Sequence, residues 1–424
     1  PAALAVLALL TGCSTLNAPP KVDVAEPTYV QAERVAAPVV SNGSIFQSAS
    51  YRPLFEDHRA RLVGDTLVVQ IVEKVSASQK STSSIDKSSD MSGSVTALPF
   101  LNGSKALGRA SLRARIARHY GETYNVDVAP QRVVVTTGSS GGFILSFLAL
   151  FDAGDRVAVA APGYPAYVNI LEALGCVCVP LETTAATRHA VTAQMIEAAH
   201  REQPLKGVLL MSPANPSGVM MSDESLREIC AACDRLGVAF ISDEIYHGLT
   251  YERPAETALK FTNEAIVVNS FSKYYCMTGW RVGWLVLPEE LVRPVERLQQ
   301  SLAISVPFLS QVAAEAAFDA RDELEAVKAG YARNRAALMA ALPKMGLTEF
   351  HPPDGAFYIY ADIGRFTNDS LDFSRRLLEE AGVAATPGVD FDRARGARTL
   401  RLSYAGSEAD IAEAIDRMAG WLKA

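Results

Sequence analysis

Residues 132–151 read RVVVTTGSSGGFILSFLALF and place a strand, a glycine-rich turn and a helix in direct succession. The apolar run Arg132–Thr137 predicts a strand that is buried on both faces, because it shows no alternation with polar residues. The run Gly141–Phe151 is long and apolar enough for a helix. A strand that passes through a tight turn into a helix favours an α/β fold.

The alternation of strands and helices continues along most of the chain. Helices are predicted at Leu112–Tyr120 and Ser222–Leu236. Further strands are predicted at Arg156–Ala161, Cys176–Leu181, Lys206–Met211, Val238–Asp243 and Ala265–Asn269. This order predicts an α/β large domain over residues 106–300 with a mostly parallel sheet. Long helices follow, then strands near Phe357–Ile363 and Thr399–Tyr404, so residues 301–424 are predicted to form a smaller α/β domain.

The turn Thr137–Gly142 is a possible phosphate site, because backbone N–H groups at a helix N-terminus bind anions and glycines allow a close approach. It lacks the lysine of a P-loop and the spacing of a dinucleotide fingerprint. The signal is therefore weak when it is taken alone.

The segment Asn269–Gly283 reads NSFSKYYCMTGWRVG and carries the strongest chemical signal. Lys273 follows an apolar strand in a small polar turn, and Arg281 comes eight residues later. Schiff-base chemistry needs an amine with a lowered pKa, and a phosphate needs a fixed cation and hydroxyl groups. Lys273, Ser270 and Arg281 meet both needs. The alternative is a surface turn with ordinary charges.

This S-F-S-K-x7-R segment resembles the class I/II aminotransferases of fold type I, and the likeness extends over residues 106–424. The resemblance implies that Lys273 holds pyridoxal 5'-phosphate as a Schiff base. It implies that Asp243 keeps the cofactor's ring nitrogen protonated, and that Tyr246 and Asn215 contact its phenolic oxygen. Taken singly, Asp243 could be a helix cap and Asn215 part of a plain turn.

Other positions match the same family. The resemblance implies that Ser139, Ser140 and Gly141 cradle the cofactor's phosphate together with Ser270 and Arg281.

It also implies that Tyr164 stacks on the cofactor ring, where a core tyrosine is the alternative. Arg401 is a lone charge in an apolar strand, and a buried arginine needs a partner. The resemblance makes Arg401 the clamp for the substrate α-carboxylate, with a structural ion pair as the alternative, and it implies that Asn215 also binds the substrate.

The resemblance implies that the enzyme domain transfers an amino group between an L-amino acid and a 2-oxo acid, and that it does so as a cytoplasmic homodimer. Another fold type I enzyme, a lyase or a decarboxylase, would share the Lys273 constellation and stays open.

The first hundred residues differ in character. A short apolar run, Ala2–Leu10, is followed by Leu-Thr-Gly-Cys13, which resembles a bacterial lipobox. Residues 1–12 are thus expected to be the remnant of a signal peptide, and Cys13 a lipidation site and membrane anchor. Residues 1–97 resemble the N-terminal part of the flagellar L-ring lipoprotein through GSIF at 43–46, PLFEDH at 53–58 and the strand-like Thr66–Val75.

The two resemblances imply different locations. Class I/II aminotransferases are cytoplasmic, whereas L-ring lipoproteins with an intact signal are exported to the outer membrane. We expect a fusion, with an extended, strand-poor L-ring-like segment and linker at residues 13–105. This segment stands where the family has a dimerisation arm, a glycine that contacts substrate and a tyrosine that reaches the partner's phosphate, near Gly103. Impaired cofactor binding is the expected consequence. The alternative function is a structural L-ring lipoprotein with a passenger enzyme domain.

The amino-acid composition excludes few classes of protein, but it argues against some kinds of binding partner. The 424 residues carry a formal net charge of −7 with no basic cluster, which argues against a nucleic-acid partner. Cys230 and Cys233 fall within a helical pattern with no second Cys/His pair nearby, which favours buried thiols. The six histidines are scattered, so no metal site is expected.

Overall fold

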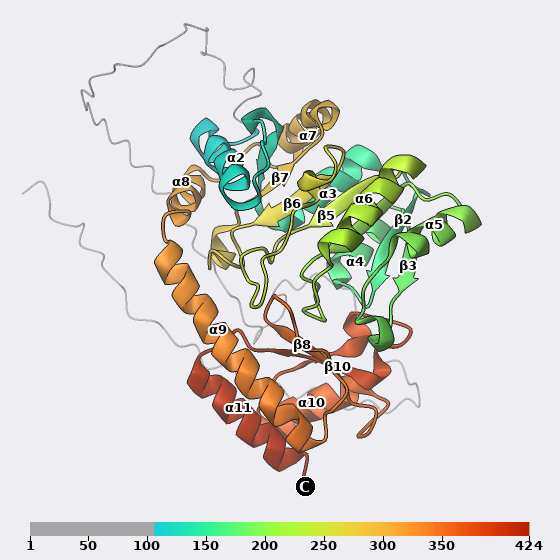
Figure 1. The fold of residues 1–424 in the computed structure, drawn as a ribbon, viewed down its shortest axis with the longest axis vertical. Helices are drawn as coiled ribbons and strands as arrows, with labels where there is room; N and C mark the ends of the chain where they lie inside the picture. Colours follow the sequence, from blue (N-terminus) through green and yellow to red (C-terminus); the bar gives the residue numbers. More distant parts are fainter. Residues whose placement is uncertain (1–105, 424) are drawn as a thin grey trace, which may run out of the picture. The chain divides into compact units, whose positions relative to one another are not determined.

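Two β-sheets organise residues 106–423, the part of the chain that the computed structural model describes (Figure 1). The larger sheet has seven strands in the order β1-β7-β6-β5-β4-β2-β3. β2 through β6 pair in parallel, whereas β7 runs antiparallel to both β1 and β6. The predicted mostly parallel α/β sheet is therefore confirmed. Its strands are β1 Val133–Thr136, β2 Arg156–Ala161, β3 Val177–Glu182, β4 Gly207–Met211, β5 Ala239–Asp243, β6 Ile266–Ser270 and β7 Gly283–Val286.

Helices cover both faces of this sheet. Val133 and Val135 join a cluster with α2, α5 and α6, while Val134 joins a cluster on the other face with α3, α4 and α7. Because successive side chains point to opposite faces, a strand covered on both sides needs apolar residues throughout. The helices are α2 Ala110–Tyr124, α3 Gly138–Leu150, α4 Pro165–Ala173, α5 Ala193–Glu202, α6 Asp223–Leu236 and α7 Glu289–Leu302.

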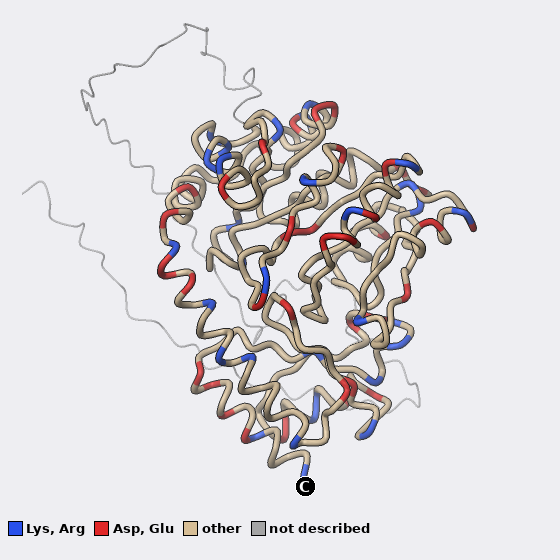
Figure 2. Tube along the Cα trace, in the orientation of Figure 1, with Lys and Arg blue, Asp and Glu red and all other residues tan. Residues whose placement is uncertain are grey.

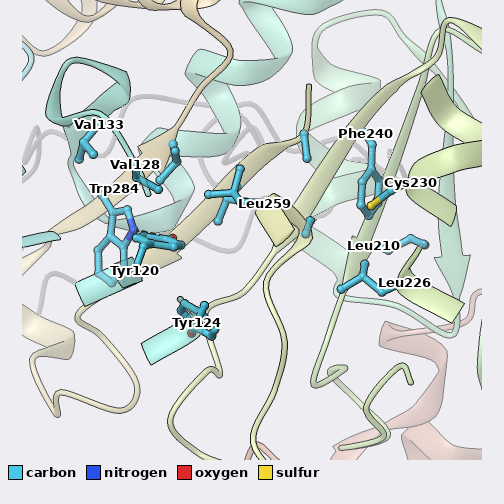
Figure 3. Close-up of a cluster of buried hydrophobic side chains, with 14 of the residues drawn as sticks. Tyr120, Tyr124, Val128, Val133, Leu210, Leu226, Cys230, Phe240, Leu259 and Trp284 are labelled. Atoms are coloured by element: carbon cyan, nitrogen blue, oxygen red, sulfur yellow. Dashed lines mark hydrogen bonds between the residues drawn. The ribbon is translucent and has the colours of Figure 1, made fainter. Parts of the chain in front are cut away.

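Figure 3 shows part of the cluster on the α2 face, where aromatic side chains gather. Tyr120 and Trp284 are completely buried, and Trp284 Nε1 donates to Tyr120 Oη at 3.1 Å. Tyr124 lies one turn further along α2 and is also buried. The Trp284 hydrogen bond holds α2 against β7, and a contact between Tyr124 Oη and His247 Nδ1 holds it against the turn that follows β5.

The smaller sheet is antiparallel, in the order β8-β10-β9, with β8 Tyr358–Asp362, β9 Thr386–Pro387 and β10 Thr399–Ser403. It packs against α9, α10 and α11 through a third cluster. Figure 2 shows charges of both signs along α9 and α11, and Arg333 pairs with Glu408 between these two helices at 2.6 Å. The helices are α8 Phe308–Ala317, α9 Arg321–Ala341, α10 Ser370–Ala381 and α11 Glu408–Trp421.

Short 3₁₀ helices connect these elements: η2 Pro130–Arg132, η3 Ala185–Thr187, η4 Ala258–Lys260, η5 Thr278–Trp280, η6 Leu342–Met345, η7 Gly388–Asp390 and η8 Gly396–Arg398. Among the described residues, no helix combines the length and the apolar character needed to cross a bilayer.

Two local expectations need correction. α3 begins at Gly138, three residues before the predicted start at Gly141, so the glycine-rich turn is itself the first turn of the helix. β7 was not predicted, because its four residues begin at Gly283, the last residue of the segment that the sequence marks as a functional loop.

Other expectations stay open. Cys13, the strand-like Thr66–Val75 and the segment 13–105 lie outside the described residues. We keep a domain boundary at residue 300 as a proposal, and note that Ala314 of α8 and Leu324 of α9 join the cluster on the α2 face of the large sheet.

Candidate active site

A cavity of about 280 Å³ brings together most of the predicted site residues. It lies where β4, β5 and β6 end and α3 begins, which is where parallel α/β sheets usually bind ligands. Its predicted lining residues are Ser139, Ser140, Tyr164, Asn215, Asp243, Tyr246, Lys273, Arg281 and Arg401. A larger cavity, about 600 Å³, shares Tyr164 with it but contains no other predicted site residue.

One end of the cavity is built to hold an anion. Ser139 and Ser140 lie in the first turn of α3, and no side chain caps this helix N-terminus. The Arg281 guanidinium packs against Gly138, which has a left-handed φ of +72° and no room for a Cβ atom. Arg281 donates to the Thr278 carbonyl at 3.0 Å, and none of the ion pairs among residues 106–423 includes it. Free N–H groups, a helix dipole and a guanidinium together suit a phosphate.

A buried carboxyl group also lines this cavity. Asp243 is the last residue of β5 and is 1% exposed. Its Oδ1 accepts from the Ile245 N–H at 3.1 Å, and its Oδ2 accepts from Tyr167 Oη. Burial raises the pKa of Asp243 to about 7, against the opposing effect of the Tyr167 hydrogen bond. A carboxylate in this position is best stabilised by a cation.

Lys273 lies just beyond β6 and lines the same cavity. Its Nζ is 5.7 Å from the centre of the Tyr246 ring and 5.5 Å from that of Phe357. Burial lowers the pKa of the Lys273 ammonium, and the Arg401 charge lowers it further, against the opposing effect of Asp243. A lysine with a lowered pKa has a larger neutral fraction, which is the nucleophilic form.

Arg401 reaches the cavity from β10. Its Nη1 donates to Asn215 Oδ1 at 2.8 Å and its Nη2 to Thr386 Oγ1 at 3.0 Å. The guanidinium lies 4.3 Å from the centre of the Tyr358 ring, while its Nε is buried without a hydrogen-bond partner. The ion pairs among residues 106–423 do not include Arg401, so its charge is not neutralised within the described part of the chain. Its remaining hydrogen-bonding capacity suits a carboxylate ligand.

Two predicted contacts are not brought to the cavity. Gly141 lies in the first turn of α3, packed against Thr137, and does not line it. Ser270 is buried at the end of β6, where its Oγ donates to Ser272 Oγ at 2.9 Å. Ser272 lines the cavity instead. The segment contains two serines close to the lysine, and the sequence does not distinguish them. The course of the backbone decides which of the two faces the cavity.

Sequence reasoning also missed Tyr167 and Tyr358. Tyr167 holds Asp243, and Tyr358 Oη is 2.9 Å from Tyr246 Oη. The spacing Tyr164-x-x-Tyr167 at the start of a helix was the available signal, because residues three apart share a helix face. Tyr358 had no comparable signal, since it comes from a strand more than 100 residues away in sequence.

These groups fit pyridoxal phosphate. The α3 N-terminus and Arg281 suit its phosphate, and the buried Asp243 suits its ring nitrogen. Lys273 would supply the amine that holds the cofactor, and Arg401 would bind a substrate carboxylate in the same cavity.

Comparison with known proteins agrees with this chemistry. The family model "Aminotransferase class I and II" matches residues 99–418. The chain is 50% identical over 326 residues to valine–pyruvate aminotransferase of Mycobacterium tuberculosis, covering 76% of this chain and 84% of that protein. It is 34% identical over 320 residues to (5-formylfuran-3-yl)methyl phosphate transaminase of Methanocaldococcus jannaschii, covering 74% of this chain and 82% of that protein.

A crystal structure of an aminotransferase from Mycobacterium tuberculosis superimposes with a TM-score of 0.73 at 50% identity, covering 75% of this chain and 83% of that one. A second family model, "Flagellar L-ring protein", matches residues 39–132 and overlaps the aminotransferase match over residues 99–132. The L-ring-like N-terminal segment and the enzyme are thus both recognised within one chain. By its fold and these likenesses, the chain belongs to the class I and II aminotransferases, a family of pyridoxal-phosphate-dependent enzymes.

Proposed function

We propose that Lys273 carries pyridoxal phosphate covalently and that the chain transfers amino groups between an L-amino acid with an uncharged side chain and a 2-oxo acid such as pyruvate. The observation that carries this proposal is the position of Lys273. Its amine lies in one cavity with an uncapped helix N-terminus, a buried carboxyl group and an arginine that pairs with no carboxylate among residues 106–423.

Each residue has a task that its surroundings explain. When bound, pyridoxal phosphate supplies an electron sink for the electrons of the substrate's Cα–H bond. Ser139, Ser140 and Arg281 would hold the phosphate, and Arg401 would fix the substrate carboxylate. Asp243 would hold a proton on the ring nitrogen, because an ionised carboxylate in a dry site strongly favours a cationic neighbour. The lowered pKa of Lys273 lets its amine accept and return the substrate's α-proton.

The substrate class follows from the charges in the cavity. Its lining contains three cationic side chains, Lys273, Arg281 and Arg401, and each is already used for the cofactor or the α-carboxylate. The described lining therefore offers no cation to a second substrate carboxylate. The similarity to a valine–pyruvate aminotransferase supports the same class.

A homodimer is the proposed assembly, as is typical of aminotransferases. Ile304, which lies between α7 and α8, and Phe308 and Leu309, which begin α8, are 75%, 66% and 71% exposed. Ile304 also has a left-handed φ of +61°, which is rare for a β-branched residue and needs support from its surroundings. Large apolar side chains that are exposed close together in sequence suit a protein interface. Sedimentation of the purified chain over a concentration series measures this assembly directly.

For location, we propose that the enzyme domain acts in the cytoplasm. Outer-membrane anchoring through Cys13 is expected only where the chain is made with an intact upstream signal. The match of the flagellar L-ring family model to residues 39–132 supports an L-ring-like origin for the segment that follows Cys13. Chain made with such a signal but recovered without lipid on Cys13 would reject the anchor.

The test of the reaction is a paired assay with valine as the donor. With pyruvate present, the purified chain should form 2-oxoisovalerate and alanine in equal amounts. Without pyruvate, product should stop at about one equivalent of enzyme, because the amino group has no acceptor. Continued turnover without an acceptor would indicate a lyase or decarboxylase, and aspartate reacting faster than valine would reject the substrate class.

A further inference from the structure

The turn that follows β5 has two faces with different partners. Asp243, Ile245 and Tyr246 line the active-site cavity. Glu244 and His247 instead contact α2 and η4, and neither lines that cavity. The backbone of the turn is tight, since the His247 N–H donates to the Glu244 carbonyl at 2.9 Å. A displacement of one face therefore displaces the other.

The face of this turn that carries Glu244 and His247 contacts two other elements. Glu244 Oε1 accepts from Thr257 Oγ1 at 3.0 Å and from the Ala258 N–H at 2.9 Å, both at η4. His247 Nδ1 lies 2.8 Å from Tyr124 Oη, at the end of α2. Glu244 Oε2 lies 3.5 Å from His247 Nδ1 and has no hydrogen-bond partner within the described part of the chain.

All of these groups are withdrawn from water. Glu244 is 1%, His247 7% and Tyr124 8% exposed. Burial raises the pKa of Glu244 to about 8 and lowers the pKa of His247 to about 3, so both are neutral near pH 7. A buried polar network with nearly all of its atoms hydrogen-bonded favours one arrangement of its members.

We propose that Glu244, His247 and Tyr124 form a positioning network that holds the turn bearing Asp243 and Tyr246 from behind. This inference rests on the proposed function, because it assigns Asp243 and Tyr246 to the cofactor. The network explains why a carboxyl and an imidazole stay buried beside the site without reaching it. It also makes α2, which contributes no residue to the cavity lining, a support of the active site.

The chain offers a matched pair of variants for the test. Tyr124→Phe removes the hydroxyl that contacts His247. Tyr120→Phe removes a hydroxyl one turn earlier on the same helix, which bonds Trp284 of β7 and not the turn. Both changes delete one buried hydroxyl, so both should lower the unfolding temperature to a similar degree.

The measurements are amide hydrogen exchange over residues 244–249 in cofactor-free protein and the dissociation constant for pyridoxal phosphate. Tyr124→Phe should speed exchange there by about tenfold and weaken cofactor binding by roughly threefold to tenfold, the effect of losing one hydrogen bond. Tyr120→Phe should leave both near wild type. Equal effects of the two variants on residues 244–249 would overturn the proposal.

A second pair keeps the test informative if Tyr124→Phe fails to fold. Glu244→Gln keeps the side-chain oxygen that accepts from Thr257 and Ala258 and resembles the neutral acid, so it should retain exchange protection and cofactor affinity. Glu244→Ala should lose both. If Glu244→Gln is as impaired as Glu244→Ala, the positioning role is wrong. Failure of wild-type protein to bind the cofactor would instead reject the proposed function, while the exchange contrast in cofactor-free protein still tests the network.

Discussion

At the scale of single residues, Asp243 shows how much a site depends on neighbours that no motif names. Its position at the end of a strand was predictable from ISDEIY, but its hydrogen bond from Tyr167 was not. Tyr167 lies on α4, 76 residues earlier in the chain, and its approach to Asp243 requires the full sheet to be assembled. The same holds for the choice of Ser272 over Ser270 in the cavity lining. Motifs identify the chemistry, whereas packing selects which of two equivalent side chains performs it.

Tyr167→Phe should raise the pKa of Asp243, because the lost O–H donor stabilises the ionised carboxylate. The ring nitrogen of the cofactor then has a weaker anionic partner near neutral pH. We expect turnover to fall by about tenfold at pH 7, with partial recovery as the pH is raised and Asp243 ionises. The measurement is kcat against pH.

Tyr251→Phe serves as the control, because Tyr251 Oη donates to the Ala356 carbonyl outside the cavity lining. A Tyr167→Phe profile that coincides with this control would contradict the role of Tyr167.

At the scale of elements, the alternation of apolar runs and helical segments sufficed to predict the large sheet except β7. β2 matches its predicted bounds, and the other predicted strands differ by about a residue at their ends. β7 was missed because GWLV is short and lies directly after η5, where the sequence shows glycines and an arginine. The early start of α3 was missed because glycines disfavour helix interiors, although they are tolerated in a first turn that must approach Arg281.

The proposed phosphate-binding role of the first turn of α3 can be tested by substitution of Gly138. Gly138→Ala should weaken binding of pyridoxal phosphate strongly. The alanine would have to adopt the left-handed backbone of Gly138, which is strained for a residue with a Cβ, and its methyl group would overlap the Arg281 guanidinium. Equilibrium dialysis with the cofactor measures the loss.

Gly121→Ala in α2 is the matched control. No atom lies within 4 Å of the position of its Cβ, so it should leave cofactor binding unchanged and raise stability by up to about 1 kcal/mol. Similar cofactor affinities for the two variants would reject the phosphate role of this turn.

At the scale of the whole molecule, two buried carboxyl groups side by side make stability depend on pH. Burial holds the pKa of Asp243 at about 7 and that of Glu244 at about 8, both above their unfolded values. Such a group contributes its full stability below its unfolded pKa and loses it as the pH rises toward the folded value. His247 acts in the opposite direction below pH 6.5, because its pKa is lowered.

Comparison of wild type with Glu244→Gln isolates one of these groups. As the pH rises from about 5 to 8, wild type should lose stability relative to the variant by up to about 1.4 kcal/mol per pH unit. Chemical denaturation of cofactor-free protein at several pH values measures this difference. A difference that stays constant over the range would show that Glu244 ionises normally in the folded chain.

The N-terminal segment bears on the activity of the whole chain. Replacing residues 1–105 with the N-terminal segment of an aminotransferase from the same family should raise cofactor affinity, dimer fraction and turnover together. The replacement segment would restore one hydrogen-bond donor to the cofactor's phosphate. Such a hydrogen bond is worth about tenfold or more in affinity for pyridoxal phosphate. If the chain already matches the repaired protein in all three measurements, the impairment expected from its N-terminal segment is wrong.

The covalent role of Lys273 is the central claim, and locating the reduced adduct tests it most directly. The purified chain is loaded with pyridoxal phosphate, reduced with borohydride, digested and analysed by mass spectrometry. We expect one major adduct, on the peptide that contains Lys273, and its loss in Lys273→Ala while the folded state persists. An adduct that remains on another lysine in Lys273→Ala at the wild-type level would contradict it.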